Sequence, residues 1–206
     1  EKFIKEQYKW VFGKYPDFGA KNRSISRAGA LRVYNAKMAE NLLQTTNYRR
    51  SEIQEIADIT MGQSPSSSYY NKDGQGLPFH QGVSDYGDRF PVNVTYCSKE
   101  FRIAEAGDIL FSVRAPVGRI NITLERIVIG RGLASIRSNK KHQEFLFYCL
   151  KNIFFKDDLM GTGAIYAAIT KKDLTELNII YPLESTINMF TEYVKPIDNL
   201  IKSLHL

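Results

Sequence analysis

The lysines, carboxylates and histidines of this chain lack the spacing that common catalytic sites require. Many metal-dependent nucleases carry an acidic residue two positions before a lysine, and no lysine here has Asp or Glu at that position. The histidines, His80, His142 and His205, are far apart and do not have metal-ligand spacing. We therefore expect a chain that is not an enzyme and that itself holds no metal ion or cofactor.

Motifs that bind nucleotides or activate a nucleophile are also incomplete. The chain has no P-loop, and Phe79 and Tyr166 replace the third glycine in the two stretches that begin like a dinucleotide fingerprint. No Asn-Pro pair occurs, as base methyltransferases need, and no serine lies between the glycines of a nucleophile elbow. A catalytic domain of another type, active without partners, stays an alternative.

Basic residues give the chain a net charge of +6, from 28 Lys and Arg against 22 Asp and Glu. Arginine dominates the middle of the chain, which contains Arg89, Arg102, Arg114, Arg119, Arg126, Arg131 and Arg137. The planar guanidinium forms paired hydrogen bonds with phosphate or guanine, so this distribution favours a polyanionic partner. The alternative is that these arginines are solvated or pair with carboxylates.

Short helices and strands must position these side chains. Apolar spacing predicts helices over residues 1–12, 35–44 and 142–155. Capping-box spacing predicts short helices that begin at Ser51, ending near Asp58, and at Thr170. Runs rich in strand-forming residues predict strands over residues 108–113, 117–123 and 126–137, and a further strand that ends at Pro182.

The last segment has the most regular apolar pattern. Its apolar residues recur at alternating intervals of three and four, the spacing of a coiled-coil seam, and they are Ile187, Phe190, Val194, Ile197, Ile201 and Leu204. We interpret them as the face of a helix that pairs with a partner. The alternative is an amphipathic helix packed on its own domain. Pro196 should kink or split this helix.

The remaining sequence features indicate a cytoplasmic chain. Cys97 and Cys149 lie among apolar or aromatic neighbours, which favours buried, reduced thiols. No apolar run approaches the ~20 residues of a membrane span, and charges interrupt the first residues where a signal peptide would be apolar.

Five short stretches carry the strongest sequence signal. They are residues 59–66, 77–87, 107–118, 129–134 and 168–174. The most specific is Gly107-Asp108-Ile109-Leu110-Phe111-Ser112-Val113-Arg114-Ala115-Pro116-Val117-Gly118. In this order they resemble the target-recognition domains of type I restriction–modification specificity subunits. Residues 10–12 and 29–35 resemble the helix end and the spacer that precede a second recognition domain.

The resemblance implies an α+β fold: an irregular, twisted, β-rich target-recognition domain with short helices and a C-terminal α-helical arm. Residues 1–50 would be the end of a conserved helix plus its spacer, residues 51–183 the recognition domain, and residues 184–206 the start of a conserved dimerisation or spacer helix. The chain would be the C-terminal half of a longer subunit or a half-subunit that dimerises.

The same resemblance implies the function and the partners. One recognition domain would read half of a bipartite target in double-stranded DNA. Its partners would be modification (methyltransferase) subunits, a restriction subunit, and a second copy or a second recognition domain. S-adenosylmethionine, ATP and Mg would be bound by those partner subunits alone.

Polar loops are the expected DNA-contact surface. Gln pairs with adenine and Arg with guanine through two hydrogen bonds, whereas Lys contacts phosphates. A solvated side chain is the alternative for each residue; Arg114 could form a buried structural ion pair, and Arg131 could pair with Asp108. The predicted contact residues are Ser64, Ser66, Ser67, Tyr69, Tyr70, Lys72, Gln81, Arg89, Arg114, Arg131, Thr162, Lys171 and Lys172.

Two further functions fit the same residues. The chain could be the recognition chain of another restriction–modification class, and only the identity of its partner would separate that function from the first. It could also be a protein-interaction module whose 12 Phe and 12 Tyr form an adhesive surface. Such a module would show no salt-dependent binding of DNA.

Overall fold

The computed structural model describes residues 48–160 and 168–205 of the chain. The helices predicted over residues 1–12 and 35–44, and Thr162, lie outside these described residues. Short strands come first along the described part, and helices follow and end it, which is the mixture of an α+β fold. The predicted fold class is therefore confirmed.

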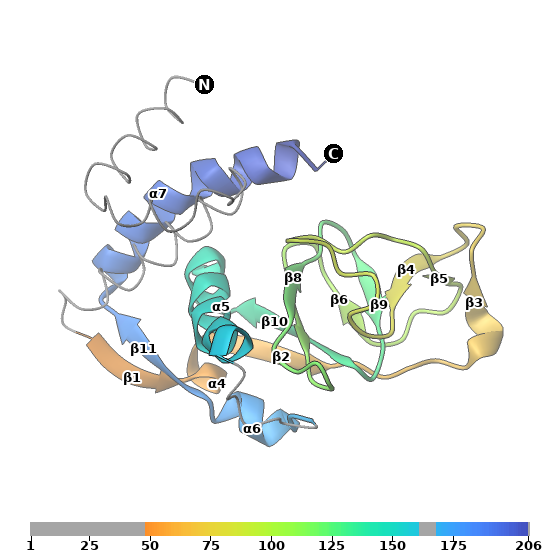
Figure 1. The fold of residues 1–206 in the computed structure, drawn as a ribbon, viewed down its shortest axis with the longest axis horizontal. Coiled ribbons are helices and arrows are strands. Elements are labelled where there is room, and N and C mark those ends of the chain that lie inside the picture. Colours follow the sequence, from red (N-terminus) through yellow and green to blue (C-terminus); the bar gives the residue numbers. More distant parts are fainter. Residues whose placement is uncertain (1–47, 161–167, 206) are drawn as a thin grey trace.

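The centre of the fold is a four-stranded antiparallel sheet with the strand order β2-β10-β7-β8 (Figure 1). Its strands are β2 (Ala57–Met61), β7 (Ile109–Ser112), β8 (Ile120–Ile122) and β10 (Leu133–Ser138). Successive side chains of a strand point to opposite faces. Because Phe111 and Ile136 join the main core while Leu110 and Leu133 join a second cluster, both faces of this sheet are buried.

A second sheet packs on one of these faces, with the strand order β3-β5-β4-β9-β6. Its strands are β3 (Tyr70–Asn71), β4 (Leu77–His80), β5 (Tyr96–Cys97), β6 (Ile103–Ala104) and β9 (Ile127–Ile129). The β4–β9 pair is parallel and the others are antiparallel. Ile127 and Ile129 pack with Leu110 and Leu133, so β9 joins the two sheets.

Helices cover the opposite face of the central sheet. Helix α5 (Gln143–Met160) packs between the sheet and helix α7 (Glu184–Ser203) (Figure 1). The two-stranded antiparallel ribbon of β1 (Tyr48–Glu52) and β11 (Asn178–Pro182) closes the domain beside them. Two single-turn helices lie next to the ribbon strands in sequence: α4 (Ile53–Ile56) follows β1, and α6 (Lys171–Thr175) precedes β11.

Two sequence predictions about these elements were wrong in detail. Residues 126–137 form two strands, because the turn at 130–132 sends β9 into one sheet and β10 into the other. Ser51 does not cap a helix, since it pairs with Ile179 in the ribbon and its buried hydroxyl has no hydrogen-bond partner among the described residues. Helix α4 begins after Glu52 without a side-chain cap and ends at Ile56.

The second capping-box prediction is confirmed. The Thr170 hydroxyl accepts a hydrogen bond from the Asp173 backbone N–H, and the Asp173 carboxylate accepts one from the Thr170 N–H. The Thr170 hydroxyl also donates to the Asp173 carboxylate (2.7 Å), and this bond, together with the one from the Thr170 N–H, lowers the pKa of Asp173. The thiols of Cys97 and Cys149 are free and buried, as expected, and β11 ends at Pro182 as expected.

Helix α7 contains the predicted seam, but most of that seam faces its own domain. Ile187, Phe190, Val194 and Ile197 are buried, and the first three belong to the main core with α5. Leu204, at the other end, is 79% exposed. The interpretation of the whole seam as a partner-binding face is therefore wrong for its first four residues, because all four are buried within the chain and the first three pack in the core that contains α5. Pro196 lies inside α7 without splitting it.

We expect Phe190→Ala to lower the stability of the isolated chain, in the absence of any partner. Phe190 packs edge-to-face on Phe145 and Tyr148, so we expect the free energy of unfolding to fall by about 3–5 kcal/mol. Leu204→Ala is the matched control at the exposed end, with an expected change within about 0.5 kcal/mol. Equal effects in urea denaturation would contradict the packing of the seam on α5.

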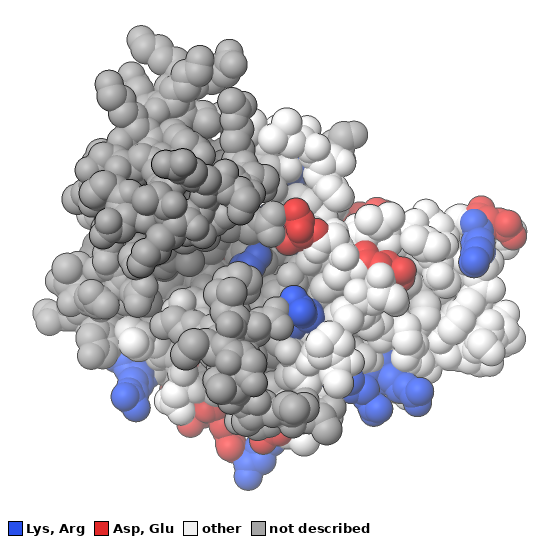
Figure 2. Space-filling view, in the orientation of Figure 1, with Lys and Arg blue, Asp and Glu red and all other residues white. Residues whose placement is uncertain are grey.

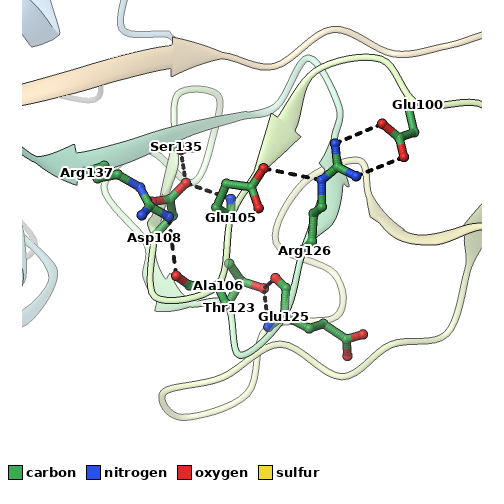
Figure 3. Close-up of polar contacts among 9 residues, drawn as sticks. All are labelled: Glu100, Glu105, Ala106, Asp108, Thr123, Glu125, Arg126, Ser135 and Arg137. Atoms are coloured by element: carbon green, nitrogen blue, oxygen red, sulfur yellow. Dashed lines mark hydrogen bonds and ion pairs between the residues drawn. The ribbon is translucent and has the colours of Figure 1, made fainter.

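Asp108 is the hub of a polar network at the start of β7 (Figure 3). Its carboxylate accepts hydrogen bonds from the Ser135 hydroxyl (2.7 Å) and the Glu105 backbone N–H (2.8 Å). Arg137 completes the site as an ion pair at 2.6 Å. Asp108 is buried, whereas the neighbouring pair of Arg126 with Glu100 is exposed to solvent.

We expect Asp108→Ala to destabilise the fold more than Glu100→Ala. Loss of the Asp108 carboxylate leaves the Ser135 hydroxyl and the Glu105 N–H without an acceptor, at a cost of about 1–3 kcal/mol for the buried Ser135 hydroxyl and less for the partly buried N–H. Exposed ion pairs such as Arg126–Glu100 contribute at most about 1 kcal/mol. Chemical denaturation of the two variants measures this difference, and equal losses would refute the hub role.

Candidate nucleic-acid interface

Three loops meet at the turn between β9 and β10, and backbone hydrogen bonds hold them there. Each bond joins segments that are far apart in sequence. They run from Gln63 N to Ile129 O (3.1 Å), Gly130 N to His80 O (2.8 Å), Gly132 N to Gln81 O (3.1 Å) and Val113 N to Gly132 O (2.9 Å). The loops after β2, β4 and β7 are thus fixed on this turn, which we call the β9–β10 turn (residues 130–132).

Glycines allow this close approach. A Cβ atom at Gly62 would lie 2.1 Å from the carbonyl oxygen of Gly130, and one at Gly132 would lie 2.6 Å from the carbonyl oxygen of Gln81. Contacts of this length exclude any side chain, so the loops could not meet here with other residues. The glycines on both sides of Arg131 therefore serve the packing of loops.

Side chains add a relay across the same junction. The Arg131 backbone N–H donates to the Ser64 hydroxyl (3.1 Å), which donates to Oε1 of Gln81 (2.8 Å). Gln81 and Arg131 are exposed and Ser64 is partly buried. Tyr70 lies close by: burial raises its pKa and the Arg131 charge lowers it in part. The structure thus brings four predicted contact residues together.

Several residues of the predicted 64–72 loop have structural roles. Tyr70 donates to the carbonyl oxygen of Pro65 (2.8 Å) and stacks on Phe79, with ring centroids 4.5 Å apart. The Ser66 hydroxyl caps the single 3-10 turn η1 (Ser67–Tyr69). Lys72 and Ser67 are exposed, and η1 and β3 lie at the end of the molecule opposite strand β1 (Figure 1).

Arg114 extends the junction toward α6. The Val113 carbonyl oxygen accepts from the Ile169 N–H (2.8 Å), and Arg114 forms a β-bridge with Ala168. Arg114 is exposed and makes no ion pair with the described residues, so the alternative of a buried structural pair is wrong. Lys171 and Lys172 follow on α6, both exposed, and Lys172 also pairs with Glu176 at 3.8 Å.

Basic side chains gather along one edge of the molecule. In Figure 2 blue Lys and Arg atoms lie along the lower edge, where Figure 1 has α6 and the loops of the central sheet. Red carboxylates lie between them near α6. The edge can therefore attract a polyanion while keeping exposed donors at the β9–β10 turn.

Arg89 does not belong to this edge, so its prediction as a contact residue is wrong. It is buried, with its guanidinium 2.8 Å from the Asp198 carboxylate of α7 and 3.0 Å from the Tyr148 hydroxyl. It also covers the Phe147 ring at 4.4 Å. Tyr148 in turn donates to Asp198 (2.6 Å). Arg89 therefore links the β-rich part of the domain to α5 and α7.

Burial controls the protonation of this link. It raises the pKa of Tyr148 to about 12, so the hydroxyl keeps the proton that it donates to Asp198. It also raises the pKa of Asp198, and the Arg89 charge opposes that shift.

Asp108 pairs with Arg137, and the alternative that Arg131 pairs with Asp108 is wrong.

Sequence reasoning missed Lys99, whose ammonium lies 5.1 Å from the centre of the Tyr69 ring. The two residues meet because β3 pairs with β5. The sequence does not predict this contact, because strands of two residues are too short to show a periodic pattern. Lys99 adds a cation to the end of the molecule that carries η1.

Other classes of site find no support in the part of the chain that the structure describes. Its His, Cys, Asp and Glu side chains form no group of three that could hold a metal ion. Its helices include none that is long and apolar enough to cross a membrane.

Comparison with known proteins decides the family. Residues 46–204, more than half of the chain, match the type I restriction modification DNA specificity domain. The chain belongs to this family. The prediction of a specificity domain and not an enzyme is thereby confirmed, and the protein-interaction alternative is not favoured.

Individual relatives of this DNA specificity domain agree. A putative type I restriction enzyme MjaX specificity subunit from Methanocaldococcus jannaschii is 40% identical over 179 residues, which are 79% of this chain and 42% of that protein. The HsdS subunit from Thermoanaerobacter tengcongensis is 32% identical with a TM-score of 0.66, over 97% of this chain and 52% of that one.

A third relative comes from a structure described as the basis of complex assembly and conformational transition of the type I R-M system. It is 34% identical with a TM-score of 0.64, over 97% of this chain and 53% of that chain. This DNA specificity domain therefore spans about half the length of the relatives it matches.

The structural role of Arg89 can be tested by Arg89→Met. Removing one partner of a buried ion pair leaves the other charge uncompensated, so the free energy of unfolding should fall by about 3–5 kcal/mol. The double variant Arg89→Met/Asp198→Leu removes both charges and should recover most of that loss. A stable Arg89→Met protein with impaired DNA binding would instead show that Arg89 is a DNA-contact residue.

Proposed function

We propose that this domain reads one half of a bipartite target in double-stranded DNA and directs partner methyltransferase and restriction subunits to it. One observation carries the proposal. In a chain of the DNA specificity family, the β9–β10 turn fixes loops from three other parts of the sequence, and Gln81, Arg114 and Arg131 are exposed on these loops and on the turn.

The edge offers two kinds of contact. Phosphate contacts hold a protein in register on the duplex, and base contacts supply the sequence preference. Arg114, Lys171 and Lys172 have the charge and exposure for phosphates. Gln81 and Arg131 carry planar groups that match base edges, and they lie on the most firmly held loops of the domain.

Partners would supply the rest of the system. The other half of the target would be read by a second copy of the chain or by a second recognition domain. Met189 and Tyr193 of α7, and Leu204 at its C-cap, are exposed apolar residues and offer a contact for a partner helix. S-adenosylmethionine, ATP and Mg would be bound by the partner subunits, and we expect the assembly in the cytoplasm.

DNA retention over a salt series tests this function. The purified chain should bind random duplexes at low salt and lose them as salt rises, because bound phosphates release counterions. With a modification subunit present, the binding should become selective for sequence. Absence of retention at low salt in both cases would exclude DNA reading and favour a protein-interaction module.

We expect Arg114→Gln to reduce the salt dependence of binding. One phosphate contact contributes about 0.9 to the slope of log K against log salt, so the slope should fall by about that amount while sequence preference stays unchanged. Arg126→Gln is the matched control, because Glu100 and Glu105 already hold that guanidinium. Fluorescence anisotropy measures the salt dependence of DNA binding for the two variants. An equal slope for both would show that Arg114 does not contact a phosphate.

A further inference from the structure

Ser64 fixes the orientation of the Gln81 side-chain amide. The Ser64 hydroxyl accepts a hydrogen bond from the Arg131 N–H, and it donates its own proton to Oε1 of Gln81. The amide oxygen therefore faces Ser64, and the NH2 group lies on the other side of the amide. Within the described part of the chain this NH2 group has no hydrogen-bond partner, and Gln81 is exposed.

Arg131, whose backbone N–H binds the same Ser64 hydroxyl, carries a second planar donor group. A guanidinium donates hydrogen bonds and accepts none. Arg131 is exposed, and it makes no ion pair with a described residue. The cluster of Ser64, Gln81 and Arg131 therefore offers mainly donors to a ligand, while Oε1 of Gln81 already accepts one hydrogen bond from Ser64.

The backbone of the β9–β10 turn is not a phosphate cradle. Such a cradle presents free N–H groups to the anion. Here the N–H groups of Gly130, Arg131 and Gly132 donate to His80, Ser64 and Gln81. What remains for a ligand is two planar side-chain groups, and planar groups match the edges of bases. A fixed amide would also be unnecessary for phosphate, which accepts from any direction.

The pattern of donors selects one base. In the major groove guanine presents two neighbouring acceptors, N7 and O6, whereas adenine presents an acceptor and a donor, and cytosine presents a donor. The usual pairing of Gln with adenine needs a free amide oxygen to accept from adenine N6. Ser64 already donates to that oxygen, so adenine N6 would have to share it, whereas guanine requires only the donors that Gln81 and Arg131 have free.

We propose that Gln81 and Arg131 together read a guanine in the major groove of the half-site, and that Ser64 is the positioning residue that keeps the donor side of Gln81 toward it. This inference rests on the proposed function of the domain. It adds the identity of a base and the residues that select it.

The experiment measures relative binding of the full chain, with its modification subunit, to a library of duplexes. The unaltered protein should prefer guanine at one base pair, and 7-deazaguanine there should weaken binding by about 5- to 150-fold. Gln81→Glu replaces the donor with an acceptor, so the preference at that pair should move to cytosine. Ser64→Ala frees the amide, so the preference for guanine over adenine should fall to what Arg131 alone supplies, and Ser64→Thr should keep the full preference.

Controls separate the possible failures. Arg126→Gln should change nothing, and thermal melting of each variant checks that it folds. If Gln81→Glu and Arg131→Gln weaken every duplex by the same factor, the cluster contacts phosphate and the inference is overturned. If they leave the base preference unchanged, the cluster is only a support for the loops and the inference is equally overturned. Failure of the unaltered protein to bind any duplex would instead reject the proposed function itself.

Discussion

The alternation of side chains along β7 and β10 is the constraint on which the rest of the domain depends. One set of residues meets α5 and the other meets the second sheet, so the central sheet is buried on both faces. β10 is paired on both sides, by β2 and by β7. Because the β9–β10 turn leads directly into this strand, the turn is as well anchored as the core. Exposed donors on it are held by the most buried part of the fold.

Periodic and capped elements could be predicted from the sequence, and the small strands could not. Helix α5, the α6 capping box, the end of β11 and the continuous apolar face of α7 follow from local spacing. Strands of two residues such as β3 and β5 carry no periodic signal, since their partners are distant in sequence. Ser51 had the same capping spacing as Thr170, but its pairing with β11 overrode that local preference.

The residues of the candidate site were likewise predictable only in part. Polar residue types near glycines indicated Ser64, Gln81 and Arg131, and these three residues do meet. Arginine alone did not separate a surface contact from a buried link. Arg89 also lies near a glycine, Gly87, yet it is buried in an ion pair with Asp198, which lies over a hundred positions later. Whether Arg89 is buried depends on the packing of α7 against the rest of the domain, and local sequence does not predict that packing.

The loops at the junction are joined mainly through main-chain atoms, and this has an evolutionary consequence. Main-chain hydrogen bonds do not depend on residue type, apart from the glycines that permit the close approach. Exposed side chains on the same loops can therefore be exchanged without dismantling the support beneath them. A lineage can acquire a new target by a few surface substitutions, and the same property makes this domain a suitable scaffold for engineered specificity.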